Sequence, residues 1–420
     1  MKMIFQEVFP LENAKMGDIM KLRKGSSVML LQFKFKNHKC FYDETLLDLV
    51  ATQEKRHLET TFESNDINVL PVISIHGANA SGKTGVLEAL YFMFSIVKYS
   101  NSIDINDDLP VNPFIFNSKI ENSEYEISVL IDDYEYRYGF EINKDMICDE
   151  WLYVKRNSTR AVQKTIFHRT KKKVDFGKEY KKYNNIWDLF KNQEYNKLLV
   201  LSSVALKDTD GIIRNLFEYI SKFDIKLEGR LSNRINISFF NEENKLYDKF
   251  KTFLNDFDPC LLGIEVSEIE ADGKKISIIN GIHKSEDGNT MLLPMNRESQ
   301  GTWKLFSIMP SILTNLENGG LLCIDELDTK LHPLLFRKIV NMYCDKEINK
   351  KNAQLIFTTH STMLFNSEYL RRDELYITDK DEMGKSSLYS LSEFRNLRYD
   401  SDYEKRYLSG QFGGIPFVDK

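Results

Sequence analysis

The stretch GANASGKT at 77–84 decides the fold of this chain of 420 residues. It fits the spacing GxxxxGK[ST], and it joins a short β-branched run, VLPVISIH at 69–76, to a helix-like run that begins at about residue 84. When a strand leads through such a loop into a helix, backbone N–H groups and the helix amino terminus can cradle phosphates. The sequence therefore predicts a phosphate-binding loop in an α/β domain.

The residues of this loop have separate expected tasks. Gly77 and Gly82 allow backbone angles that a β-carbon would block. Lys83 can reach the β and γ phosphates of a nucleotide, and Thr84 can ligate Mg²⁺. Three residues between them complete the expected cradle: Asn79, Ala80 and Ser81.

A second motif, LLCIDELD at 321–328, is a hydrophobic run that ends in two adjacent acids. A carboxylate at the carboxyl end of a buried parallel strand meets a ligand bound there. Asp325 is therefore expected to hold Mg²⁺, directly or through water, and Glu326 to polarise the attacking water. An acidic pair that caps a helix is the alternative interpretation.

A third motif, LIFTTHS at 355–361, is another short apolar run, and it ends in His360. A histidine there can hydrogen-bond a γ-phosphate or the attacking water. A lone histidine is more often structural, but its place after a strand, about thirty residues beyond the acidic pair, favours the functional interpretation.

In this order the three motifs resemble the ABC-ATPase superfamily, including the RecF, SMC and OLD-type ATPases and the prokaryotic AAA_15 and AAA_21 defence ATPases, similar to AbiL- and PARIS-type subunits. The resemblance spans about residues 29 to 420. It implies an α/β ABC-ATPase head with a phosphate-loop mixed sheet, an antiparallel β lobe and a helical insertion. It also implies ATP and Mg²⁺ as cofactors and hydrolysis to ADP and phosphate.

ABC-type ATPases carry a signature loop before the acidic strand, and NRESQGTWKLF at 296–306 resembles its ExxGT form in the OLD-like branch. Ser299 and Gly301 match the serine and glycine of that form. A hydroxyl and a tight backbone at a helix start can grip the γ-phosphate bound to an opposite subunit. A helix cap formed by Ser299 is compatible with that task.

Two further positions follow from the same resemblance. Asp328, in ELDTKLHP at 326–333, resembles the D-loop that crosses the dimer seam. In FKNHKCF at 35–41, Lys39 stands where RecF-like relatives have an arginine that approaches phosphates. A surface lysine is the alternative at that position.

One part of the family pattern is missing. No glutamine lies between Thr84 and Arg160 to serve as the loop that couples Mg²⁺ to the second lobe. Asn112 or Asn117 are the substitutes considered. The absence leaves lobe coupling open and is compatible with slow turnover.

The chain divides into four expected parts. They are an amino-terminal extension (1–28), ATPase lobe I with the phosphate loop and antiparallel strands (29–183), a helical insertion (184–260), and lobe II with the signature, acidic strand and histidine (261–420).

Strands are expected where apolar and polar residues alternate, at 29–36, at 123–155 with a turn at Asp132 and Asp133, and at 262–282 with a turn at Asp272 and Gly273. Apolar residues spaced by three and four predict helices in the insertion. The basic run RTKKKVDFGKEYKKY at 169–183 is expected to be a solvated hairpin or linker, with nucleic-acid contact as the alternative.

Composition narrows the class of protein. The formal net charge of −5 argues against a surface that coats nucleic acid indiscriminately, because counterion release needs clustered Lys and Arg. Five separated cysteines without a CxxC pair suggest neither a zinc site nor a disulfide framework. No signal peptide and no run of eighteen uncharged apolar residues is seen, so a soluble cytoplasmic protein without membrane association is expected.

The resemblance also implies a biological role. Complementary half-sites make ATP an adhesive between heads, so a homodimer or higher assembly is expected. The leading hypothesis is a prokaryotic anti-phage ATPase that senses infection and controls a separate effector, such as a TOPRIM or RloB-like nuclease or another toxin, because only sixty residues follow His360. The alternative is a RecF-like ATPase that binds DNA in repair or maintenance. A transporter subunit and an SMC-like tether are disfavoured, since the glutamine loop and long heptad arrays are missing.

Overall fold

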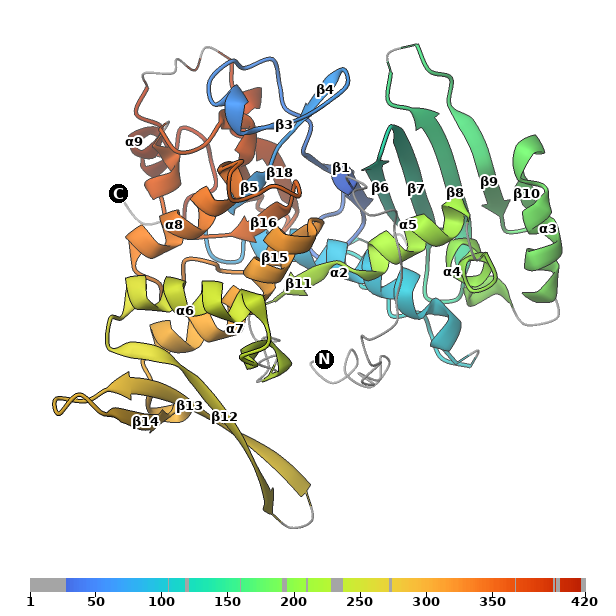
Figure 1. Ribbon diagram of the computed structural model, residues 1–420. Coiled ribbons are helices and arrows are strands. Elements are labelled where there is room, and N and C mark those ends of the chain that lie inside the picture. Colours follow the sequence, from blue (N-terminus) through green and yellow to red (C-terminus); the bar gives the residue numbers. More distant parts are fainter. Residues whose placement is uncertain are drawn as a thin grey trace.

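The computed structural model describes residues 28–104, 106–117, 121–158, 160–190, 195–208, 211–227, 237–271, 274–366, 368–395, 397 and 401–416. Two large sheets lie side by side (Figure 1). The core sheet has six strands in the spatial order β11 (Asp224–Lys226), β15 (Leu321–Ile324), β16 (Gln354–Thr358), β5 (Val72–His76), β17 (Leu375–Lys380) and β18 (Ser386–Ser390). All neighbours are parallel except the pair β17 and β18. The carboxyl ends of β5, β15 and β16 therefore share one edge, which positions the three motifs together.

Side chains on the buried strands β5, β15, β16 and β17 alternate between two hydrophobic cores. Ile73 and Ile75 face the core shared with α2 (Lys83–Tyr99) and the second sheet. Val72 on the same strand faces the other core, which includes residues of α6 (Lys245–Phe257), α7 (Gln300–Asn318) and α8 (Pro333–Cys344). This period of two is that of a strand buried on both sides, which explains the unbroken apolar runs in the sequence.

The second sheet is antiparallel throughout. Its strands follow the spatial order β10 (Val174–Phe176), β9 (Lys164–Thr170), β8 (Ile147–Arg156), β7 (Tyr134–Ile142), β6 (Ser123–Ile131), β1 (Val28–Lys36) and β2 (Thr45–Asp48). The predicted strands at 29–36 and 123–155 are confirmed, and Asp132 adopts a positive φ of 53° in the turn. Tyr125, Tyr138 and Phe140 are buried on one face of this sheet. The lysines at 171–173 form the exposed turn of the β9–β10 hairpin.

The interval at 184–260 contains the expected helices and one element that was not predicted. Besides α6 it holds α4 (Val200–Ala205) and α5 (Ile212–Ser221), and α3 (Lys182–Trp187) crosses its first boundary. Between α5 and α6, β11 pairs in parallel with β15 and so completes the core sheet. Three residues are too short to show a hydrophobic period, so this strand left no signal in the sequence.

A three-stranded sheet projects from the body beside α6 and α7 (Figure 1). It consists of β12 (Leu261–Ala271), β13 (Lys274–Lys284) and β14 (Thr290–Pro294), of which only the first two were predicted. The predicted turn at Asp272 and Gly273 lies outside the described residues, as does the amino-terminal extension up to residue 27. Besides short 3-10 helices, the described part of the chain also contains the hairpin β3 (Phe62–Ser64) and β4 (Ile67–Val69), and α9 (Tyr403–Leu408). None of the described helices is long and apolar enough to cross a membrane.

Candidate nucleotide-binding site

The phosphate loop leaves β5 and enters α2, as the motif predicts. Gly77 has φ 146°, and a β-carbon there would lie 2.5 Å from the carbonyl oxygen of Thr378. Gly82 caps α2 with φ 118°, and Ala80 also has a positive φ of 64°. Asn79 and Ala80 form the exposed tip of the loop, and the Ser81 hydroxyl hydrogen-bonds that of Thr378 at 2.6 Å. The strained backbone is thus held by a neighbouring strand, which is expected where a loop is preorganised for a ligand.

Lys83 folds back over this loop. Its ammonium group donates hydrogen bonds to the carbonyl oxygens of Gly77 at 2.9 Å and Ala78 at 3.0 Å. Burial lowers the pKa of Lys83, and the nearby carboxylates of Glu326, Asp325 and Asp328 oppose that shift. A positive charge held by neutral carbonyls, with acids close by, can turn to nucleotide phosphates.

The acidic strand delivers Asp325 to the start of α2. The Thr84 hydroxyl donates to both Asp325 oxygens at 3.1 Å, and the Thr358 hydroxyl donates to Oδ1 at 2.6 Å. Asp325 is only 2% exposed. A hydroxyl and a carboxylate that converge are hard oxygen ligands, and Mg²⁺ is typically held by one or two such groups together with phosphates and water. Thr84 and Asp325 therefore fit the metal that the sequence predicts.

Glu326 adopts a strained backbone conformation with φ 49°. Its N–H donates to the Thr358 hydroxyl at 2.7 Å, and its carbonyl oxygen accepts from the Lys304 ammonium at 3.0 Å. Its carboxylate accepts from the Thr329 hydroxyl at 3.1 Å. A non-glycine residue in the left-handed region costs free energy of about 1–3 kcal/mol and persists where its surroundings hold it. Contacts from β16, α7 and the following loop hold Glu326 in this conformation, beside Lys83.

His360 follows β16, so it lies between the phosphate loop and the acidic pair. Its side chain is exposed, and its backbone N–H lies 3.3 and 3.4 Å from the two carboxylate oxygens of Asp328. The structure thus brings Asp328 and His360 together at the edge that carries Lys83.

Ser299 caps α7, as expected, and the cap is compatible with the predicted signature role. It is exposed, and its hydroxyl oxygen accepts from the N–H of Thr302 at 3.1 Å. A β-carbon on Gly301 would lie 2.8 Å from the carbonyl oxygen of Lys330, two residues after Asp328. The signature segment therefore packs against the loop that follows the acidic pair.

Lys39 lies beside α2. Its ammonium group pairs with Glu88, and its N–H donates to the carbonyl oxygen of Asn112 at 2.7 Å. Asn112, considered above as a substitute for the missing glutamine, thus reaches the Lys39 segment through its backbone.

Sequence reasoning missed three residues that position the acids: Thr358, Thr329 and Lys304. Thr358 was within reach of inference, since β16 lies between β5 and β15 and its last residue must stand between their two motifs. Lys304 carried no such signal, because a lysine in a helix is usually exposed, whereas this one is 6% exposed.

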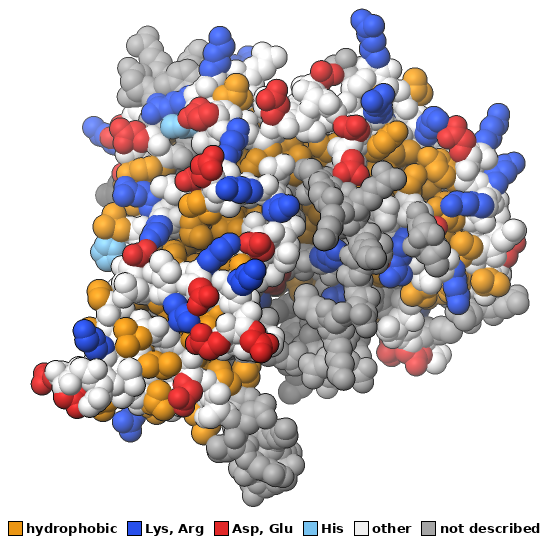
Figure 2. All heavy atoms as spheres, in the orientation of Figure 1, with side chains coloured by type: hydrophobic (Ala, Val, Ile, Leu, Met, Phe, Trp, Pro, Cys, Tyr) orange, Lys and Arg blue, Asp and Glu red, His pale blue; other side chains and the backbone are white. Residues whose placement is uncertain are grey.

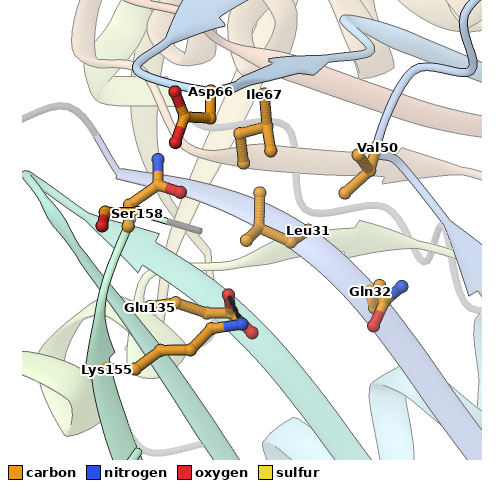
Figure 3. A pocket seen from close by; sticks show the side chains of 9 residues that line it. Leu31, Gln32, Val50, Asp66, Ile67, Glu135, Lys155 and Ser158 are labelled. Carbon is orange, nitrogen blue, oxygen red and sulfur yellow. Dashed lines mark ion pairs between the residues drawn. The ribbon is translucent and has the colours of Figure 1, made fainter. Parts of the chain in front are cut away.

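A hollow of about 300 Å³ lies elsewhere, between the β3–β4 hairpin and the second sheet (Figure 3). Leu31, Val50 and Ile67 form its apolar side, and Lys155 and Glu135 pair across 2.8 Å at its rim. It lies near the amino end of β5, whereas the phosphate loop follows the carboxyl end. None of the predicted site residues lines it, so we do not assign the nucleotide to this hollow.

Comparison with known proteins gives three findings. A family model described as "AAA domain, putative AbiEii toxin, Type IV TA system" (AAA_21) matches residues 72–366. The "Retron Vc95 probable ATPase" of Vibrio cholerae serotype O1 biovar El Tor is 25% identical over 210 residues, which cover 49% of this chain and 38% of that protein. This match therefore spans less than half of the relative's length.

Among solved structures, this chain is similar to three heads of SMC proteins. They are an SMC head bound to the C-winged helix domain of ScpA (TM-score 0.40, 13% identity, 86% of this chain and 97% of that one), the SMC head domain from Thermotoga maritima (0.37, 14%, 86% and 98%), and an Smc head domain with a coiled coil and joint derived from Pyrococcus yayanosii (0.39, 11%, 91% and 99%).

Proposed function

The chain belongs to the AAA_21 family of ATPases, and on that premise we propose that it hydrolyses ATP at sites completed between two copies and acts as a sensor in prokaryotic antiviral defence. The observation that carries the proposal is the convergence of Lys83, Asp325 and Glu326 on one edge of the core sheet. Phosphoryl transfer needs charge stabilisation, a metal site and an oriented water, and these three residues supply one each.

Each residue has a task that its geometry supports. Lys83 leaves the loop carbonyls for the β and γ phosphates, and Thr84 and Asp325 hold Mg²⁺. The metal, when bound, neutralises charge on the phosphate oxygens. Glu326 orients the attacking water and accepts its proton, and His360 is close enough to Asp328 to approach the γ-phosphate from the same edge.

The signature segment supports a composite site. Ser299 is exposed at the amino terminus of the nineteen-residue helix α7, where the helix dipole favours a phosphate. The Ser299 hydroxyl oxygen accepts from the N–H of Thr302 and also hydrogen-bonds the Thr302 hydroxyl at 2.8 Å. When Thr302 is the donor of that pair, the Ser299 hydroxyl can donate to the γ-phosphate of a second copy. ATP then joins two heads, and hydrolysis releases them.

The defence role rests on the family and on the retron ATPase relative. In this proposal the ATP-joined assembly holds or activates a separate effector, a nuclease or another toxin.

Measuring ATP turnover and assembly mass of wild type and Glu326→Gln tests the proposal. We expect the glutamine variant to bind ATP, to turn over about 100-fold more slowly and to accumulate the assembly, since it lacks the proton acceptor. Glu347→Gln, an exposed change after α8, is the control and should match wild type. Unchanged turnover in Glu326→Gln would remove this residue from catalysis.

A mixing experiment tests the composite site. Lys83→Ala and Ser299→Asp should each be inactive alone, because aspartate still caps α7 but repels the γ-phosphate. In mixed assemblies one intact Lys83 meets one intact Ser299, so about half of the composite sites in each mixed dimer should work. Absence of rescue would argue for sites built within one chain.

Direct action on DNA is the second candidate. The exposed lysines of the β9–β10 hairpin favour it, although Lys173 and Lys164 already pair with Asp175 and Glu179. Figure 2 shows acidic and basic side chains interspersed on the face it draws. Stimulation of turnover by DNA alone, lost steeply with salt, would favour this candidate over an effector-controlling head.

A further inference from the structure

The segment at 402–416 packs against β17 and the first residue of the phosphate loop, Gly77. It begins with α9, which Asp402 caps by accepting from the N–H of Lys405 at 2.9 Å. After α9 the chain turns through Gly413 and Gly414, with φ of 71° and 65°. A β-carbon on Gly414 would lie 2.4 Å from Cγ2 of Ile377 and 3.5 Å from Cα of Gly77. The positive φ and the clash with Ile377 both require glycine at 414, and this places the segment in van der Waals range of Gly77.

Tyr407 joins α9 to both sides of this contact. Its hydroxyl donates to the carbonyl oxygen of Gly414 at 3.0 Å. Burial raises the pKa of Tyr407 to about 12, and the backbone N–H of Gly77 acts against that rise. The Tyr407 hydroxyl thus holds Gly414, where an added β-carbon would contact Gly77, and the Tyr407 ring lies 6.4 Å from the ring of His76, the residue before Gly77.

The same helix also reaches the segment that follows His360. The Thr362 hydroxyl donates a short hydrogen bond to the Glu404 carboxylate. The Tyr407 ring stacks on Phe365 with centroids 4.5 Å apart and an interplanar angle of 16°. Phe365 in turn packs on His76, the last residue of β5, at 4.5 Å.

We propose that residues 402–416 form a brace that sets the geometry of the nucleotide site from two ends, with Tyr407 positioning Gly77 and Glu404 positioning the His360 segment. The inference rests on ATP being the ligand of the phosphate loop. Neither residue touches substrate; each acts through the loop it holds. A small displacement of such loops is costly, because catalysis depends on groups placed to within about 1 Å.

Variants at the two ends of the brace should change different kinetic parameters, KM at Tyr407 and kcat at Glu404. Tyr407→Phe keeps the stacked ring but loses the hydroxyl, and we expect the KM for ATP to rise about tenfold while kcat changes less than about twofold. Glu404→Ala frees Thr362, and we expect kcat to fall about three- to fivefold with the KM near that of wild type. A general loss of stability would not raise KM in one variant and lower kcat in the other.

Tyr376→Phe is the matched control, measured on the full chain beside Tyr407→Phe. The Tyr376 hydroxyl accepts from the N–H of Asp48 and donates to the Asp48 carbonyl oxygen, both at 3.1 Å, so it ties the core sheet to β2 and not to the phosphate loop. The Tyr376→Phe variant should have a lower melting temperature and an unchanged KM for ATP. An equal rise of KM in both variants, or no rise in Tyr407→Phe, overturns the inference.

Two further outcomes are distinguishable. If wild type itself does not bind ATP, the proposed function fails and not merely the brace. If Tyr407→Phe does not fold, Glu404→Ala decides: an unchanged kcat in this variant overturns the brace, and a lowered kcat with an unchanged KM supports it.

Discussion

Two clusters of buried charge at opposite ends of the core sheet use their charges differently. At the nucleotide edge, the charged groups hydrogen-bond to neutral groups: Lys83 to backbone carbonyls, and Asp325 to the hydroxyls of Thr84 and Thr358. Near the amino end of β17, opposite charges pair directly, Arg371 with Asp373 at 2.8 Å and Arg372 with Glu54 at 3.1 Å. We call the second group the arginine cluster: Glu54, Arg371, Arg372, Asp373 and Glu374.

The arginine cluster ties distant segments together. The Arg371 guanidinium, fully buried, also donates to the carbonyl oxygens of Thr52, Glu54 and Arg56, so it joins the loop after β2 to the start of β17. Asp373 accepts from both the N–H and the hydroxyl of Thr52. Arg371, Arg372, Glu54 and Asp373 are paired with one another, whereas Oε1 of Glu374 is buried without a hydrogen-bond partner. The pairing of the four charges marks a structural cluster.

The partners of a buried charge indicate whether it stabilises the fold or binds a ligand. A buried charge whose opposite charge is already in place contributes to the fold, and removing one partner exposes the cost of the other. A charge that only neutral groups hold in place can still pair with a charged ligand. The two clusters should therefore respond to mutation in different measurements.

The largest expected effect is on folding. Arg371→Leu leaves Asp373 buried without its partner, and it should lower the free energy of unfolding by about 3–5 kcal/mol. Denaturant titration measures this change, and Arg395→Leu, at an exposed position, should shift it by less than about 0.5 kcal/mol. A loss below about 1 kcal/mol in Arg371→Leu would contradict the structural assignment of the cluster.

The next largest effect should be a loss of ATP affinity without a loss of folding stability. Lys83→Ala removes the charge that meets the phosphates, so ATP affinity should fall about 100-fold, or ~2.7 kcal/mol. Since burial lowers the pKa of Lys83, its charged form is disfavoured in the folded protein, and the substitution should not reduce stability. Calorimetric titration and denaturation of the same sample test both parts. A variant that unfolds more easily but binds ATP normally would place Lys83 with the structural charges.

A smaller effect is expected at the residue that joins the acids. Thr358→Val has nearly the same shape but loses the hydroxyl that donates to Asp325 and accepts from the Glu326 N–H. We expect kcat to fall about tenfold, or ~1.4 kcal/mol, with ATP affinity changed less than threefold. Thr61→Val, which removes a buried hydroxyl bonded to the Leu58 carbonyl, is the control and should leave kcat unchanged. Equal kcat values in the two variants would deny Thr358 a positioning task.

The sequence predicted the nucleotide edge better than the arginine cluster for a physical reason. The phosphate loop, Asp325 and His360 each follow an apolar run within a few residues, so local pattern and parallel topology suffice to bring them together. Arg371 and Glu54 are 317 residues apart, and nothing local distinguishes them from surface charges. β11 was missed because three residues show no period, and Lys304 because its burial depends on how α7 packs.

The most gradual effect, spread over several pH units, is expected at Glu374 in the arginine cluster. Burial, with the charges of Asp373 and Glu54, raises its pKa to about 8, while the Arg371 N–H and guanidinium oppose the shift. The folded state therefore keeps the proton that the unfolded chain releases above about pH 4.5. The resulting stability is complete below that pH and declines as pH rises toward 8, by at most about 1.4 kcal/mol per pH unit. Glu374→Gln retains an acceptor for the Arg371 N–H and cannot titrate, so its unfolding free energy should vary less between pH 5 and 8 than that of wild type. Parallel pH profiles of the two proteins would contradict this, and would show that Glu374 is ionised in the fold and paired like the other acids of the cluster.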